Sequence, residues 1–297
     1  HTPTQIVARA AEMGINTLAL TDRDSLAGTV EFVRACSSAG IAPVVGTDIG
    51  GVTLLGTGQD GWAGLCAAVS AVHAGAPVMS VAGEHGLVAL LGPRSDVGRY
   101  IAERRPDRAF DMLTAWREAG ARAYIEIVTH REHPDGTGLS DRFAARMLQW
   151  AIVHRTPAVL SNAVRYLYPG DARVADVLDS ARQRVPLAQH RRTSSTHQAY
   201  LTDADYMTQV AQRVSAMVGD PRDIGRALLR QTHDLAEELV IDPKVDMGIG
   251  GMYVPELAML LPGETRSSDV ILRERCERGL ADYVDREPAR RGDARLR

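Results

Sequence analysis

The stretch of sequence that decides the fold reads LALTDRDSLAG and covers residues 18–28. It joins an apolar run, which begins at Ile15 and is typical of a buried strand, to a polar segment that holds Asp22 and Asp24. Acids that follow a buried strand commonly hold a divalent cation at one end of an α/β fold. Arg23 stands between the two acids, and a guanidinium neither loses its proton nor ligates a metal. The strand end therefore either binds a metal or has lost one.

Further short apolar runs follow this first strand, and most are separated by segments with helical periodicity. Alternating strands and helices predict parallel strands joined by helical crossovers, in a barrel or a doubly wound sheet. The absence of a glycine-rich dinucleotide fingerprint after any run disfavours a Rossmann-type sheet. From about residue 170 the sequence predicts helices only. The predicted strands are 15–21, 41–46, 52–55, 87–91, 123–128 and 157–160, and the later helices are 171–184, 203–217, 224–239 and 268–283.

Composition narrows the class of protein. The chain has 297 residues with 45% hydrophobic and 24% charged residues, which is ordinary for a globular protein. Its net charge of −3 gives no global basic field for nucleic acid, so only a local patch or another segment could supply one. Three cysteines without metal-type spacing predict reduced thiols. With no membrane-length apolar run and no signal peptide, the sequence predicts a cytoplasmic protein without a membrane partner.

Both ends of the chain suggest a piece of a longer protein. His1 precedes Thr2-Pro3, which already looks like a helix cap with proline at the first helical position. The last stretch, from Asp285, is polar and arginine-rich. The glycine-rich segment 247–256 looks like a linker. We therefore predict an α/β domain over residues 1–250, and a linker with the start of a further region over residues 251–297.

The residues just past the predicted strands are the candidate site, because the carboxyl ends of parallel strands form the active face. Aspartate and histidine side chains that converge there would suit Zn²⁺ or Mn²⁺. Each residue also has a structural interpretation. Asp24 or Ser25 is expected to cap the next helix, Asp48 could shape a turn, and His130 lies in a polar loop. The strand-end residues are Asp22, Asp24, Asp48, His130, Ser161 and Asn162.

Two arginines at the same strand ends count against a metal. Arg23 and Arg165 would each place a fixed positive charge beside the candidate ligands. Such an arginine could pair with Asp22 or Asp48 and fill the site with an internal salt bridge. A bound phosphate is the other possibility, since guanidinium groups grip phosphate well.

Several dispersed motifs, in order, resemble the polymerase-and-histidinol-phosphatase (PHP) domain that opens bacterial DNA polymerase III alpha subunits. The resemblance begins with residues 6–49, which include the strand-end TDRD. It continues through IEIVTH (125–130) and the stretch that starts LSNAVRY (160–166), and VPE (254–256) falls where the family enters the polymerase proper. The TDRD form in an arginine-rich chain is similar to the error-prone, actinobacterial-type branch.

The resemblance implies a distorted seven-stranded (β/α) barrel that lacks its first strand here and is followed by helices. Active members carry a metal cluster at the carboxyl ends of the strands, which supports phosphoester hydrolysis. Asp22, Asp48 and His130 match ligand positions, whereas Arg23 replaces a histidine, and Ala163 and Arg165 replace an aspartate and a histidine. The resemblance thus implies a degenerate zinc or manganese site, lined also by Asp24 and Asn162.

Three functions remain open at this point. The first is a noncatalytic module of a DNA polymerase III alpha-type subunit, with DNA bound by the rest of the parent and other replication or repair proteins as partners. The parent's catalytic acids, which would hold two Mg²⁺ ions, would lie beyond residue 297. The second is a metal-dependent phosphoesterase that uses Asp22, Asp48 and His130. The third is an α/β protein outside this family.

Overall fold

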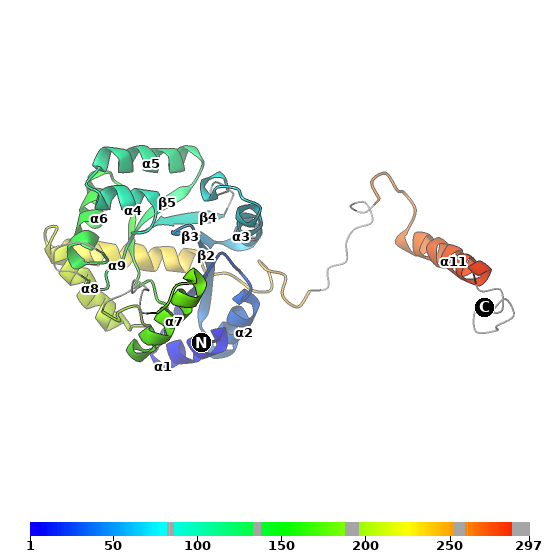
Figure 1. Ribbon diagram of the computed structural model, residues 1–297, viewed down its shortest axis with the longest axis horizontal. Coiled ribbons are helices and arrows are strands. Elements are labelled where there is room, and N and C mark those ends of the chain that lie inside the picture. Colours follow the sequence, from blue (N-terminus) through cyan, green and yellow to red (C-terminus); the bar gives the residue numbers. More distant parts are fainter. Residues whose placement is uncertain are drawn as a thin grey trace. The chain divides into compact units, whose positions relative to one another are not determined.

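A computed structural model describes residues 1–81, 83, 86–132, 138–187, 196–251, 259 and 261–286 (Figure 1). The chain divides into two compact units, residues 1–249 and residues 250–297. The first unit holds a sheet with its covering helices, and the described part of the second holds one long helix. No described helix has the length and apolar character that a membrane span needs.

Six strands of the described chain form one sheet, in which spatial order follows chain order from β1 to β6. β1 and β2 are parallel, as are β4, β5 and β6, whereas β3 runs antiparallel to both of its neighbours. The predicted α/β class and all six predicted strands are confirmed, as a curled half-barrel. The strands are β1 (Thr17–Arg23), β2 (Ala42–Ile49), β3 (Val52–Gly56), β4 (Leu87–Leu91), β5 (Arg122–Ile127) and β6 (Ala158–Leu160).

The prediction that all strands are parallel is wrong for β3. Only Gly50 and Gly51 connect β2 to β3, and two residues allow a hairpin but no crossover. Both glycines have positive φ, 61° and 88°, which a tight hairpin turn requires and which costs a glycine little. The chain consequently reverses at the carboxyl end of β2, so the start of β3 lies at the same edge as the ends of the parallel strands.

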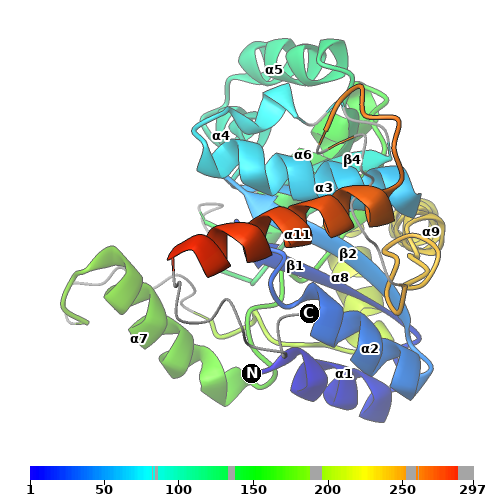
Figure 2. The same cartoon turned by 90° about the vertical axis from the view of Figure 1, so that its right-hand side faces the viewer.

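A layer of helices covers one face of the sheet and buries the larger core. The start of the first of these helices, α1, is set by its local sequence. Thr2 Oγ1 accepts from the Gln5 amide at 3.3 Å, and Gln5 Oε1 accepts from the Thr2 amide at 3.0 Å. Figure 2 shows α1 beside α2 next to β1. The helices of this layer are α1 (Pro3–Glu12), α2 (Thr29–Ala39), α3 (Gly58–His73), α4 (Asp96–Ala102), α5 (Pro106–Glu118) and α6 (Asp141–Val153).

The opposite face of the sheet packs against α9 (Pro221–Glu238), which follows α8 (Ala204–Ala216) (Figure 1). Leu235 and Leu239 contact apolar side chains of β2, β3, β4 and β6, so the sheet curls around this helix. α9 also satisfies the free edge of β6. The amides of Ala158 and Leu160 donate to Gln231 Oε1 at 3.0 Å and to Thr232 Oγ1 at 2.8 Å. A helix thus takes hydrogen bonds that a further strand would otherwise accept.

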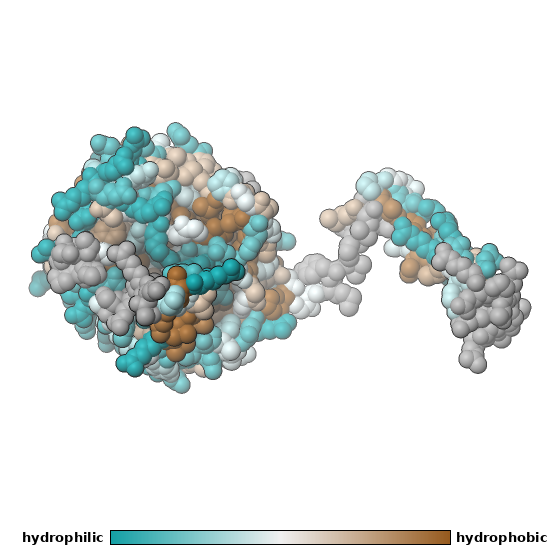
Figure 3. All heavy atoms as spheres, in the orientation of Figure 1, coloured by the Kyte–Doolittle hydropathy of each residue, from teal (hydrophilic) through white to brown (hydrophobic). Residues whose placement is uncertain are grey.

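Helix α7 (Ala172–Gln183) carries an apolar stripe that faces solvent. Val174, Val177 and Leu178 lie at helical spacing and are 60%, 50% and 61% exposed. Figure 3 shows apolar side chains gathered over α7 on the viewed face. The other face of α7 anchors it, through Ala172 and Ala175 in a small cluster.

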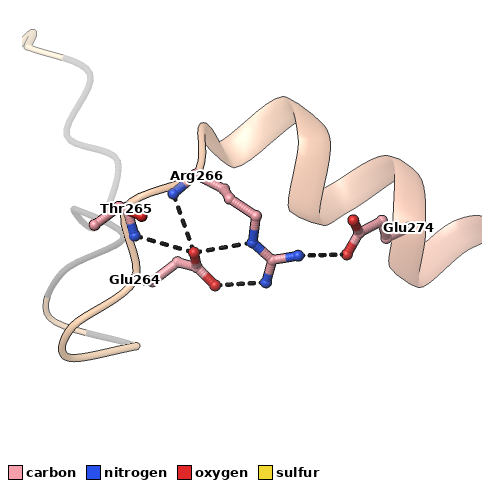
Figure 4. Close-up of polar contacts among 4 residues, drawn as sticks. All are labelled: Glu264, Thr265, Arg266 and Glu274. Carbon is pink, nitrogen blue, oxygen red and sulfur yellow. Dashed lines mark hydrogen bonds and ion pairs between the residues drawn. The ribbon is translucent and has the colours of Figure 1, made fainter.

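In the second unit, a polar network precedes α11 (Ser268–Arg286) (Figure 4). Arg266 forms two parallel hydrogen bonds with Glu264, from Nε at 2.9 Å and Nη2 at 2.6 Å, and reaches Glu274 with Nη1 at 2.8 Å. These bonds from Arg266 lower the pKa of Glu264 to about 2. The chain is thereby fixed where it enters α11.

Candidate functional site

The pairing register decides on which face of the sheet each strand-end side chain lies. Alternate residues of a strand point to opposite faces, and paired residues of neighbouring strands share a face. Val44 and Val159 pack against α9 and mark the face that we call the α9 face. Asp48 follows Val44 by four positions and pairs with Arg23, and Glu126 pairs with Val159. Arg23, Asp48 and Glu126 therefore belong to the α9 face.

Asp22 lies on the opposite face from Asp48. It pairs with Thr47, one position earlier in β2, and a one-residue step reverses the face. Its carboxylate is directed toward the start of α2, where a Cβ added to Gly28 would lie 3.1 Å from Asp22 Oδ2. Burial raises the pKa of Asp22. The pleat of the sheet thus separates two of the three predicted metal ligands.

Asp48 is held by an arginine that comes from the loop after β4. The Arg94 guanidinium donates to Asp48 Oδ2, and the Gly51 amide donates to Oδ1 at 3.3 Å. Asp48 is 9% exposed, so this pair neutralises a nearly buried charge. The sequence suggested that Arg23 or Arg165 could pair with Asp22 or Asp48. An arginine does pair with Asp48, but it is Arg94. Arg23 has no ion-pair partner among the described residues.

Glu126 is the strand-end acid that the sequence did not single out as a site residue. Ser161 donates to its Oε1 at 2.6 Å, and Gly92 leaves room for it, because a Cβ there would lie 2.4 Å from Oε2. Burial raises the pKa of Glu126; the hydrogen bond from Ser161 and the charge of Arg94 oppose that effect. A glutamate at an alternate position of an otherwise apolar strand was the available signal. Asp48, Arg94, Glu126 and Ser161 form a cluster that we call the strand-end cluster.

We expect Glu126→Gln to flatten the dependence of stability on pH. An acid whose pKa is raised in the folded state favours folding below its unfolded pKa, and that contribution is lost as pH rises through the folded pKa. Urea unfolding between about pH 4 and about pH 8 measures this. Relative to wild type, the variant should gain stability as pH rises. The exposed Glu118→Gln control should run parallel to wild type, and a parallel Glu126→Gln curve would contradict the expectation.

His130 supports the loops after β5 and β6. It is 3% exposed, and its Nε2–H donates to the Asn162 carbonyl at 2.8 Å. Burial lowers the pKa of His130. Asn162 donates through Nδ2 to the carbonyls of Gln198 and Tyr200, both at 2.8 Å. Among the described atoms, His130 Nδ1 and Glu132 Oε1 are buried without a hydrogen-bond partner.

Arg165 is engaged on α7 and does not reach Asp48. Its Nη2 lies 2.9 Å from Oδ1 and 2.8 Å from Oδ2 of Asp179, which is 5% exposed. Arg182 approaches the same carboxylate at 3.6 Å. Arg165 thus ties the segment after β6 to α7 instead of neutralising the strand-end acids.

The predicted helix cap at Asp24 or Ser25 is wrong. α2 begins at Thr29 with Gly28 as its N-cap residue, and Ser25 Oγ accepts from the Ala27 amide at 3.1 Å inside a turn. Asp24 has a φ of 52° and donates its amide to the Asp48 carbonyl at 3.0 Å. The turn takes residues 26–28, the three residues with which a helix capped by Ser25 would have begun.

The described residues do not fit a multi-metal cluster. Within the ranges that the structure describes, no group of three or more histidine, cysteine, aspartate or glutamate side chains could hold a metal ion. Asp22 lies on the wrong face, Arg94 holds Asp48, and His130 uses Nε2 as a donor. The strand-end cluster instead contains two acids, Asp48 and Glu126. The Arg94 side chain, which is 56% exposed, forms an ion pair with Asp48.

Comparison with known proteins supports the sequence motifs. Residues 1–130 match the PHP domain family. This part of the chain is therefore similar to a PHP domain. The chain is 27% identical over 315 aligned residues to DNA polymerase III subunit alpha of Xylella fastidiosa, which covers 98% of this chain and 24% of that protein. It is 41% identical over 75 residues to the error-prone DNA polymerase of Symbiobacterium thermophilum, or 24% of this chain and 7% of that protein.

The chain is similar to relatives of two polymerase classes, DNA polymerase III subunit alpha and error-prone DNA polymerase. The chain spans about a quarter of the length of the first relative. Among solved structures, an amidohydrolase of Chromobacterium violaceum is similar with a TM-score of 0.38 and 19% identity, over 54% of this chain and 81% of that one. The resemblance stated from the motifs is confirmed at the level of the PHP domain.

Proposed function

We propose that this chain is the PHP-domain portion of a DNA polymerase III alpha-type subunit and acts in it as a noncatalytic scaffold. The observation that carries the proposal is the ion pair between Arg94 and Asp48 on the α9 face. The family carries metal ligands at this strand end. Here the Arg94 guanidinium neutralises the Asp48 carboxylate in place of a metal ion. The similarity to a polymerase III alpha subunit along 98% of the chain supports the parent assignment.

The activities of the parent belong to the same proposal. Nucleotidyl transfer by a DNA-directed DNA polymerase uses two Mg²⁺ ions, and in this proposal residues outside the chain hold them. DNA would be bound mainly by that other part, and replication or repair proteins would be partners in the cytoplasm. The error-prone, actinobacterial-type branch is the finer assignment that we propose from TDRD at residues 21–24.

Metal analysis of the purified chain tests the scaffold role. After incubation with Zn²⁺ or Mn²⁺ and dialysis, elemental analysis should find less than one bound ion per chain. Hydrolysis of bis(p-nitrophenyl) phosphate should not exceed the buffer rate. The alternative function, a metal-dependent phosphoesterase, requires the opposite result for both measurements, with loss of turnover in Asp48→Asn and His130→Gln variants.

A charge-removal variant makes this test sharper. Arg94→Met frees Asp48 from its ion pair without adding a ligand. If Arg94 blocks a latent metal site, the variant should gain metal that wild type lacks; stoichiometric metal in wild type would refute the scaffold role. The parent assignment has its own test: the reading frame that contains this chain should also encode polymerase segments after residue 297.

A further inference from the structure

A groove runs between α8 and α9, away from the strand-end cluster. Its volume is about 770 Å³, and it is lined by arginine, glutamine and threonine side chains together with small and apolar residues. No aspartate or glutamate is among the lining residues. These are Thr208, Gln209, Gln212, Arg213 and Ala216 from α8, and Pro221, Arg222, Gly225, Arg226 and Leu229 from α9.

Two exposed arginines of α9, Arg222 and Arg226, line the groove, and the exposed Arg230 continues their row one turn beyond the lining residues. Arg222, Arg226 and Arg230 are four residues apart, so they share one side of the helix and span about 12 Å along it. None of the three forms an ion pair with a described residue. An unneutralised row of like charges is unfavourable by itself, because (i, i+4) neighbours repel. The row therefore favours an anionic occupant.

The α8 wall adds donors of a different kind. Gln209 and Gln212 are exposed and offer amide N–H groups toward the groove. Arg213 donates through Nε to Asp141 Oδ2 at 3.1 Å, and its Nη2 has no hydrogen-bond partner in the described part of the chain. Acids flank the arginine row on α9 at both ends, with Asp220 and Asp223 at the helix start and Asp234 one turn after Arg230. Asp220 accepts the Arg222 amide at 2.8 Å, and Asp223 follows in the first turn.

We propose that the α8–α9 groove binds the sugar-phosphate backbone of single-stranded nucleic acid. Guanidinium forks bind phosphate in two places at once, and glutamine amides donate to phosphate and sugar oxygens. A backbone supplies one negative charge per nucleotide, which suits a regular row of arginines. A duplex does not fit, because a groove between helices that pack about 8–10 Å apart is too narrow for it. With no aromatic residue in the lining, binding is independent of base sequence.

The inference goes beyond the scaffold role and does not depend on it. Its test uses the whole chain and a fluorescein-labelled oligothymidylate of about 20 nucleotides, long enough to span one groove. Fluorescence anisotropy measures Kd between about 50 and about 200 mM salt. We expect a Kd of about 10–100 μM at the low end and weaker binding as salt rises.

The decisive variant is R222Q/R226Q/R230Q. Losing three phosphate contacts should lower the log–log salt slope by about 2, at about 0.7 per contact, so wild type should lose roughly 16-fold more affinity over this fourfold salt range. R222K/R226K/R230K keeps the charges and should retain most of the slope. Q209E/Q212E adds two negative charges to the opposite wall and should weaken binding. Circular dichroism confirms that each variant folds, since exposed substitutions of this kind change stability little.

A matched control separates the groove from general charge. R34Q/R99Q/R173Q removes three exposed arginines elsewhere in the first unit and should leave the salt slope within experimental error of wild type. Equal losses in the two triple variants, or no binding by wild type at low salt, would overturn the proposal. Polyglutamate of equal length is the competitor. If it displaces the oligonucleotide at equal charge concentration, the groove is an acidic-peptide site and the nucleic-acid assignment is wrong.

Discussion

Leu239→Ala should lower the free energy of unfolding of the first unit by about 3–4 kcal/mol. Leu239 is 1% exposed and directly follows α9, where it packs against Val44, Leu55 and Val88 of the sheet. The cavity left by the missing atoms cannot close easily, because the chain beside it is pinned. The Ile241 amide donates to the Pro43 carbonyl at 3.0 Å. Urea unfolding followed by circular dichroism gives the difference.

The same substitution at an exposed leucine provides the control. Leu178 on α7 is 61% exposed, so Leu178→Ala should change the free energy of unfolding by no more than about 0.5 kcal/mol. A loss of under about 1 kcal/mol in Leu239→Ala would mean that α9 does not belong to the core of the sheet. In that case the packing on the α9 face, and the placement of the groove beside it, would need revision.

The order and type of the elements could be predicted because each is set by local sequence. Thr2 and Gln5 place the start of α1 by reciprocal hydrogen bonds, and the apolar runs place the strands. The direction of β3 could also have been predicted from Gly50 and Gly51, since a glycine pair between two apolar runs indicates a hairpin. Alternation of strands and helices suggested parallel strands, and the two-residue connection overrode it.

The site was harder to predict because it depends on register and on distant loops. Asp22 and Asp48 both follow apolar runs, yet Asp22 pairs with Thr47, and that single step places the two acids on opposite faces. Arg94 lies in a loop 46 residues after Asp48, and no local pattern joins them. Glu126 was visible as an acid within a buried strand. Its place in the site could not be predicted, because it depends on the register that pairs Glu126 with Val159 and on the hydrogen bond from Ser161.

Asp179→Ala should destabilise the first unit by about 2–3 kcal/mol. Asp179 is 5% exposed and accepts from Arg165, whose side chain is only 26% exposed, so removing the acid leaves a partly buried cation without its main acceptor. The exposed part of Arg165 regains water, and for that reason the loss stays below the value for a fully buried pair. Urea unfolding measures it, with Arg182→Gln as the control.

That control removes the second arginine on the same carboxylate. Arg182 is 59% exposed and 3.6 Å away, so its loss should cost about 0.5 kcal/mol or less. A double-mutant cycle with Arg165→Met isolates the coupling between Arg165 and Asp179, which should exceed about 1 kcal/mol. Additive effects would mean that each residue is held by other contacts. A measurable coupling would show that Asp179 holds Arg165 on α7 and so keeps it from the acids at the strand ends.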